Sequence, residues 1–201
     1  MENLINRAKN IVLQPKETWE VIKTEETSTS GILTTYVFPL VLIPAIASFI
    51  GYGFIGFNVG FFGRTASLDW GIAQAVTTFA TTFVGVIISA WVISQLAKNF
   101  GTTTSINEAT KLVAYSYTPA LLAGVFYIIP ALTILVALGG FYSLYLLYTG
   151  FQPITRVSEP QKTSYFLVSL IAIIVVSAIL YFILGVILTT FGLMGYQTIN
   201  L

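Results

Sequence analysis

Residues 112–155 read LVAYSYTPALLAGVFYIIPALTILVALGGFYSLYLLYTGFQPIT, a run of 44 residues without Asp, Glu, Lys or Arg. A single helix of that length would measure about 66 Å, roughly twice the thickness of a bilayer's hydrocarbon core. The run must therefore fold back on itself. Pro130 lies near its middle, where it lacks a backbone donor and disfavours helix at Ile129. We expect a hairpin of two membrane-spanning helices, at 110–129 and 131–149.

Three further uncharged segments are long enough to cross a membrane, for which about 20 apolar residues suffice. They give predicted spans at 33–55, 70–97 and 165–194. The chain is 56% hydrophobic and only 8% charged, with a mean hydropathy of +0.85, whereas soluble domains carry roughly 25% charged residues. So few charges cannot cover a surface of this size in water. The sequence predicts an all-α, polytopic membrane protein with five transmembrane helices over residues 31–201.

The basic residues give an independent test of the span count. Short loops rich in Lys and Arg tend to stay on the cytoplasmic side of a membrane. With five spans and a cytoplasmic N-terminus, Arg64 alone lies outside, and the other eight basic residues lie inside: Arg7, Lys9, Lys16, Lys23, Lys98, Lys111, Arg156 and Lys162. A four-span arrangement would put Arg156 and Lys162 outside as well. We therefore expect the N-terminus in the cytoplasm and the C-terminus on the opposite side.

The first 30 residues form a mixed polar segment ahead of the spans. They lack the basic region followed directly by an apolar core that marks a signal peptide, so no cleaved leader is expected. The spacing of apolar residues predicts two short amphipathic helices, with Pro15 starting the second and Trp19 and Ile22 on its apolar side. These helices either lie in the membrane interface with Trp19 as an anchor or dock a cytoplasmic protein, and the two roles are compatible. Residues 24–30 are expected to be a flexible linker.

Prolines and small residues mark the first two spans. Pro39 and Pro44 should kink the first span, and kinked packing is favoured over a transport site as their role. The second span carries small and hydroxyl-bearing residues at three- and four-residue steps, at Thr78, Thr82, Gly85 and Ser89. They predict a helix-packing face, within the bundle or between two copies of the chain. A hydroxyl-lined conduit is the alternative.

The loop before the third span contains charged residues at the membrane edge. Ser105 and Glu108 have the spacing of a capping box, and Lys111 is placed to pair with Glu108. Helix capping and a snorkelling lysine are favoured over a functional ion pair.

The sequence contains no recognisable catalytic or cofactor-binding motif. It has no Cys and no His, so it lacks thiolate chemistry and the commonest metal ligand and general base. Its net charge of +1 argues against nucleic acid, which requires a basic surface. We expect no enzyme activity, no cofactor and no metal site.

Four segments carry a family resemblance: QPKETWEVI with Pro15 and Trp19, YVFPLVLIPAIASFIGY, AYSYTPALLAGVFYIIP with Pro119, and LYLLYTGF with Gly150. They resemble the YIP family of Rab-GTPase-interacting membrane proteins, specifically its compact bacterial branch. The resemblance implies five spans and a cytoplasmic N-terminus, here in a bacterial inner membrane. Eukaryotic members associate with small GTPases and with one another in vesicle traffic between endoplasmic reticulum and Golgi. This chain departs from them in having only about 30 residues before its first span.

Two functional hypotheses follow. The first is a non-enzymatic scaffold or adaptor that organises membrane lipids and partner proteins, through a protein bound at the N-terminal segment or a second copy of the chain at the second span. The alternative is a small transporter, channel or lipid-handling protein. The candidate interaction or structural residues are Pro15, Trp19, Pro39, Pro44, Gly85, Glu108, Lys111, Pro119 and Gly150.

Overall fold

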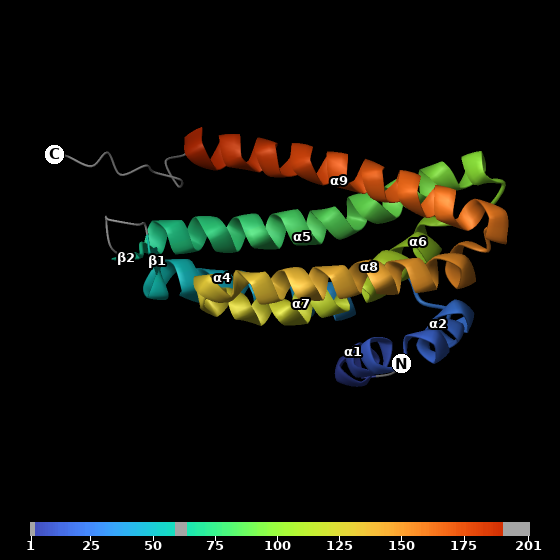
Figure 1. Ribbon diagram of the computed structural model, residues 1–201, viewed down its shortest axis with the longest axis horizontal. Helices are drawn as coiled ribbons and strands as arrows, with labels where there is room; N and C mark the ends of the chain where they lie inside the picture. The colour runs from blue at the N-terminus through green and yellow to red at the C-terminus, as the bar shows by residue number, and fades with distance from the viewer. Residues whose placement is uncertain (1–2, 59–63, 191–201) are drawn as a thin grey trace.

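The computed structural model describes residues 3–58 and 64–190 as an elongated bundle of helices (Figure 1). This part of the chain contains four helical stretches that are long and apolar enough to cross a membrane: Thr29–Ile55, Leu68–Phe100, Pro130–Thr155 and Glu159–Thr190. The chain is therefore a polytopic helical membrane protein, as its sequence predicts.

Two short helices come first, α1 (Leu4–Leu13) and α2 (Pro15–Thr24). The side chain of Asn3 caps α1 by accepting from the amide of Ile5. Pro15 starts α2, because its fixed φ suits the first helical turn and its missing N–H needs no partner there. Isolated helices of this length are marginal in water. Each helix buries one face, including Ile11 in α1 and Ile22 in α2, so packing on the bundle stabilises both.

The first span consists of four pieces: α3 (Thr29–Ile32), η1 (Leu33–Val37), α4 (Phe38–Ile50) and η2 (Gly51–Ile55). η1 is a wide π-helical turn, in which the amide of Phe38 donates to the carbonyl of Leu33. Pro39 is the second residue of α4. The wider turn before it accommodates this proline, which lacks an N–H and crowds the preceding turn. Pro44 lies inside α4 and packs against Gly124. Both prolines shape packing within the bundle.

The second span is α5 (Leu68–Leu96), extended by the 3₁₀ turn η4 (Ala97–Phe100). A two-residue antiparallel pair, β1 (Phe57–Asn58) and β2 (Arg64–Thr65), lies in the connection from the first span. Gly101 ends η4 with a φ of +67°, a conformation that costs glycine little. A Cβ on Gly71 would lie 2.7 Å from the Cα of Gly53. These two glycines therefore let α5 and η2 approach closely.

The third apolar segment is a broken helix of α6 (Ile106–Ser116), α7 (Thr118–Ala123) and η5 (Gly124–Ile128). It runs beside the first span along that span's length. At one end the side-chain amide of Asn107 donates to the carbonyl of Thr27 over 2.6 Å, and at the other the carbonyl of Tyr127 abuts Gly51. This arrangement supports a further membrane crossing by residues 106–128, although the count of five spans stays a prediction.

The chain turns at Pro130, where the sequence predicts a hairpin. Ile129 is extended, with φ −114° and ψ 101°, and is followed by η6 (Pro130–Leu132), α8 (Thr133–Thr155) and α9 (Glu159–Thr190). α8 continues beyond the predicted residue 149 to Thr155, where Arg156 takes a left-handed φ of 56°. The predicted end of the last span, at 194, lies outside the described residues.

The bundle has two distinct ends (Figure 1). We call the end that carries α1 and α2 the N-terminal end. The opposite end, with the turn into α8 and the β1–β2 pair, is the hairpin end.

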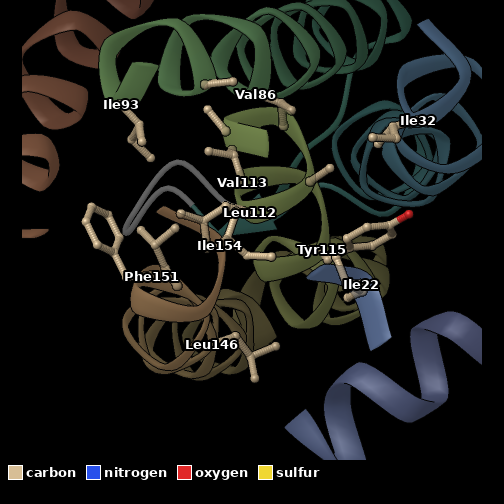
Figure 2. Packing of buried hydrophobic residues seen from close by; sticks show 14 of the residues in the cluster. Ile22, Ile32, Val86, Ile93, Leu112, Val113, Tyr115, Leu146, Phe151 and Ile154 are labelled. Atoms are coloured by element: carbon tan, nitrogen blue, oxygen red, sulfur yellow. The ribbon is translucent and has the colours of Figure 1, made fainter. Parts of the chain in front are cut away.

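The packed core is centred on α6. Eight of its eleven residues are buried, which is typical of a helix surrounded by protein on all sides. Figure 2 shows Leu112 and Val113 of α6 meeting Val86 of α5 and Ile154 of α8. An aromatic cluster adds to this core where α8 meets α9, with the rings of Phe151 and Tyr165 centred 4.8 Å apart.

Candidate functional site

The N-terminal helices are docked on the bundle through Trp19. This side chain is only 1% exposed and lies against Gly150 of α8, where a Cβ would overlap the indole ring. Gly150 therefore leaves the space that the indole ring occupies, because any side chain at this position would displace the ring. Trp19 is not the lipid-facing anchor considered from the sequence, because the docking of α2 encloses it in protein.

Lys111 of α6 binds the C-terminal end of α2. Its buried ammonium group donates to the carbonyl of Glu25 and lies 3.5 Å from the carbonyl of Ile22. Carbonyls at a helix end lack intrahelical partners and attract cations. The predicted pairing of Lys111 with Glu108 is wrong, because the docked α2 brings these carbonyls over Lys111.

Other polar contacts fix both helices and the connection that follows them. Arg7 of α1 forms an ion pair with Glu25, and its guanidinium lies 5.6 Å from the centre of the Tyr115 ring. The hydroxyl of Tyr142 in α8 donates to the carbonyl of Val12 over 2.7 Å. The predicted linker at 24–30 is thus non-helical only over 25–28 and is hydrogen-bonded to α6.

Glu108 and Pro119 have local structural roles. Ser105 and Glu108 form the predicted capping box at the start of α6, and Glu108 also lies 3.1 Å from the guanidinium of Arg156. This ion pair is partly exposed, so it contributes little to stability. Pro119 begins α7 beside Thr118, whose hydroxyl lies 2.7 Å from the hydroxyl of Tyr36 in the first span.

A cavity of about 390 Å³ lies between α4, α5, α8 and α9, toward the hairpin end. Small-molecule sites typically occupy about 300–1,000 Å³. None of its fifteen lining residues is charged, and ten carry a hydroxyl group: Ser48, Tyr52, Thr77, Thr78, Thr81, Thr82, Tyr117, Tyr127, Thr133 and Tyr181. Gln74 adds a side-chain amide. The cavity lining is therefore uncharged and rich in hydroxyl groups.

Hydrogen bonds to the backbone define what the hydroxyls can offer a ligand. Ser48 donates to the Ala45 carbonyl, Thr81 to the Thr77 carbonyl, and Thr133 to the Pro130 carbonyl, at 2.9, 2.6 and 2.7 Å. With their protons engaged, these three oxygens can only accept. Thr77 differs, because it is 3% exposed and its hydroxyl has no partner among the described residues.

The α9 side of the cavity is only partly covered by protein. Between Ile173 and Leu188 no residue of α9 is buried, although the start of this helix is packed through Tyr165 and Phe166. Tyr181 lines the cavity and is 58% exposed. In a membrane, this side of the cavity faces lipid.

Gly85 makes no close contact within the described part of the chain, and the predicted contact with a second copy stays a prediction. A Cβ there would meet nothing within 4 Å. Within the chain the close contacts lie elsewhere, at Gly124 against Pro44 and at Gly139 against Ala123. Thr78 and Thr82 of this face line the cavity.

Comparison with known proteins agrees with the architecture. The family model of the Yip1 domain matches residues 9–183. The chain is 31% identical over 156 residues to the inner membrane protein YohC of Escherichia coli strain K12, a match that covers 75% of this chain and 80% of that protein. The YohC protein of E. coli O6:H1 matches equally. No solved structure matches the chain.

The chain belongs to the Yip1 domain family.

The segments that carry the likeness meet in space within this Yip1 domain. Trp19 of QPKETWEVI lies on Gly150 of LYLLYTGF, and Pro44 of the first span packs on Gly124 of AYSYTPALLAGVFYIIP. Sequence reasoning missed the cavity residues Tyr52, Gln74, Tyr127, Thr133 and Tyr181. Their only signal was a polar group within an apolar segment, which does not show which of them converge.

Proposed function

We propose that this Yip1-domain protein is a non-enzymatic scaffold or adaptor of the bacterial inner membrane, with its N-terminal end in the cytoplasm. One observation carries the proposal: α1 and α2 are fixed to the bundle by one face and expose the other. A partner would meet a preformed surface, so binding would not require these helices to become ordered.

The distribution of basic residues supports the orientation. β2, which contains Arg64, lies at the hairpin end (Figure 1), whereas Lys98 and Lys111 lie in η4 and α6 at the other end. Positive charge favours the cytoplasmic side. The relative YohC is described as an inner membrane protein.

The exposed faces of the two helices differ in chemistry. α1 exposes the apolar side chains of Ile5 and Leu13, and the bond from Tyr142 to Val12 holds its end beside the middle of α8. This face suits the membrane interface. α2 exposes mostly charged side chains around Val21: Lys16, Glu17, Glu20 and Lys23. We assign the α2 face, defined by these five residues, to a protein partner.

Photo-crosslinking in native membranes tests the proposal. A photoreactive residue replaces Val21, and the recovered proteins are compared with those from a second version in which Lys16, Glu17, Glu20 and Lys23 are all serine. This change leaves the net charge at +1 and the buried faces intact. The control is Lys98→Gln with Glu159→Gln, both exposed and outside α2.

The adaptor role predicts that one reproducible set of proteins is recovered from the first and control versions and lost from the serine version. Recovery of nothing above background, or equal recovery with the serine version, contradicts the role.

The cavity favours a second candidate function, the handling of a lipid or small molecule. Its hydroxyl lining and its partly covered α9 side would suit a polar group entering from the bilayer. Movement of a fluorescent glycerolipid between the leaflets of reconstituted liposomes would test this function. A rate above that of protein-free liposomes supports it, and an equal rate contradicts it.

A further inference from the structure

We infer that the cavity at the hairpin end binds the uncharged, hydroxyl-bearing head group of a membrane amphiphile, such as a glycerol ester. The inference rests on the second candidate function and names its ligand class. It is independent of the adaptor role, which concerns the other end of the bundle.

The ligand's head group is uncharged because none of the lining residues that the structure describes would compensate a charge. All fifteen lining residues are neutral side chains. Moving an ion from water into such a site is costly unless it meets an opposite charge. A phosphate, carboxylate or ammonium group would therefore remain at the membrane surface.

The ligand both donates and accepts hydrogen bonds. Ser48, Thr81 and Thr133 present only acceptor oxygens, because each hydroxyl proton is bonded to a backbone carbonyl. The amide of Gln74 and the unpartnered hydroxyl of Thr77 can supply donors. An alcohol matches this mixture, since one hydroxyl donates and accepts at once, whereas a ketone or simple ester only accepts.

Among the described residues, the buried hydroxyl of Thr77 lacks a hydrogen-bond partner, which a ligand in the cavity could supply. Buried polar groups in native proteins almost always have a hydrogen-bond partner. Thr77 is 3% exposed, lines the cavity and has no such partner within the described residues. A ligand hydroxyl would satisfy it.

The ligand carries an acyl chain because the α9 side of the cavity faces lipid. Tyr181 stands in its wall and is 58% exposed, and α9 buries no residue from 174 to 187. Val136 of α8 also lines the cavity. A head group in the cavity could therefore stay attached to a chain lying along the exposed apolar surface of α9.

The test uses the full chain in lipid nanodiscs and a monoacylglycerol with a diazirine in its acyl chain. The matched probe is the methyl ester of the same acyl chain, which lacks the two hydroxyls. Labelled peptides are located by mass spectrometry. We expect the monoacylglycerol to label peptides of α9 and α8 that border the cavity, and the methyl ester to label lipid-facing positions generally.

Two variants probe the site. Thr77→Val removes the unpartnered hydroxyl at constant shape and should lower specific labelling about three- to tenfold, the size expected for one lost neutral hydrogen bond. Val136→Trp fills the cavity and should abolish specific labelling. Their controls are Thr149→Val and Leu138→Trp, which alter α8 at positions that do not line the cavity and should label like the unchanged chain.

Equal labelling by both probes would overturn the inference, and so would labelling that Thr77→Val and Val136→Trp leave unchanged. Full competition by free glycerol would also overturn it, because the acyl chain would then play no part in binding. Specific labelling without lipid movement in liposomes would leave the binding site intact and reject the second candidate function alone.

Discussion

The two ends of the bundle are built on different principles. At the N-terminal end Trp19 fills the space above Gly150, Lys111 binds the carbonyls that end α2, and the rings of Phe151 and Tyr165 join α8 to α9. At the hairpin end α9 buries no residue between Ile173 and Leu188, and a hydroxyl-lined cavity lies beside the close approach of Gly53 and Gly71.

This difference separates stability from ligand binding. Tight apolar contacts at the N-terminal end fix one arrangement of the helices, because close-packed interiors tolerate little change in volume. The hairpin end leaves space and hydrogen-bonding groups for another molecule. Substitutions at the first end should therefore change stability and docking, whereas substitutions of the hydroxyl-bearing residues of the cavity should mainly change binding.

Trp19→Ala should have the largest effect on stability. Truncating a buried Trp costs about 3–5 kcal/mol, so we expect a large loss in the free energy of unfolding and release of α1 and α2. Unfolding in detergent and limited proteolysis of residues 1–26 would measure both. Trp91→Ala is the control, because Trp91 is 56% exposed and should cost far less. Equal costs would contradict the burial of Trp19 against the bundle.

Gly150→Val should have the next largest effect. Its side chain would occupy the position of the indole, and overpacking of this kind costs about 1–3 kcal/mol. Gly140→Val, in the same helix, is the control, since a Cβ at Gly140 meets nothing within 4 Å. If Trp19→Ala and Gly150→Val disrupt the same contact, the double variant should lose less free energy of unfolding than the sum of the losses in the two single variants. Strict additivity would argue against the contact.

Lys111→Met should have a moderate effect. It keeps most of the side-chain volume but removes the donor to the Glu25 carbonyl, and an unsatisfied buried acceptor costs about 1–3 kcal/mol. Faster proteolysis of residues 1–26 should accompany the lower stability. Lys98→Met, at an exposed position, should leave both quantities unchanged. A Lys111→Met protein as resistant as the unchanged chain would show that α2 docks without this lysine.

Gly85→Ala should have the smallest effect and the opposite sign. Its Cβ meets nothing within 4 Å, and Ala is favoured over Gly in a helix by up to about 1 kcal/mol. Gly124→Ala should instead destabilise, because its Cβ would lie 2.5 Å from the Cβ of Pro44. Loss of stability in Gly85→Ala, measured together with oligomeric state, would show that this face packs against a second copy of the chain.

The span positions could be predicted because they depend on the order of residues along the chain. Charge-free runs place both ends of α5 to within two residues, Pro130 gives the turn before α8, and Ser105 with Glu108 gives a local cap. Each of these signals is contained in a short stretch of sequence.

Contacts between distant segments could not be predicted in the same way. Lys111 and Glu25 are 86 residues apart, and only the docking of α2 brings them together, so the nearby Glu108 was the wrong partner. Trp19 and Gly150 each stood out in the sequence, but nothing there showed that they touch. The cavity draws its residues from five helical segments, and its hydroxyls lie together only in the folded chain.

Hydrogen exchange of residues 4–24 in nanodiscs tests most directly whether the N-terminal helices are part of the packed bundle. The structure predicts slow exchange for the amides of α1 and α2, comparable with that of α6. In Gly150→Val, whose side chain would occupy the position of the Trp19 indole, it predicts fast exchange of the same amides. Exchange that is already fast in the unchanged chain, at the rate expected of free short helices, would contradict the docking and with it the contrast between the two ends.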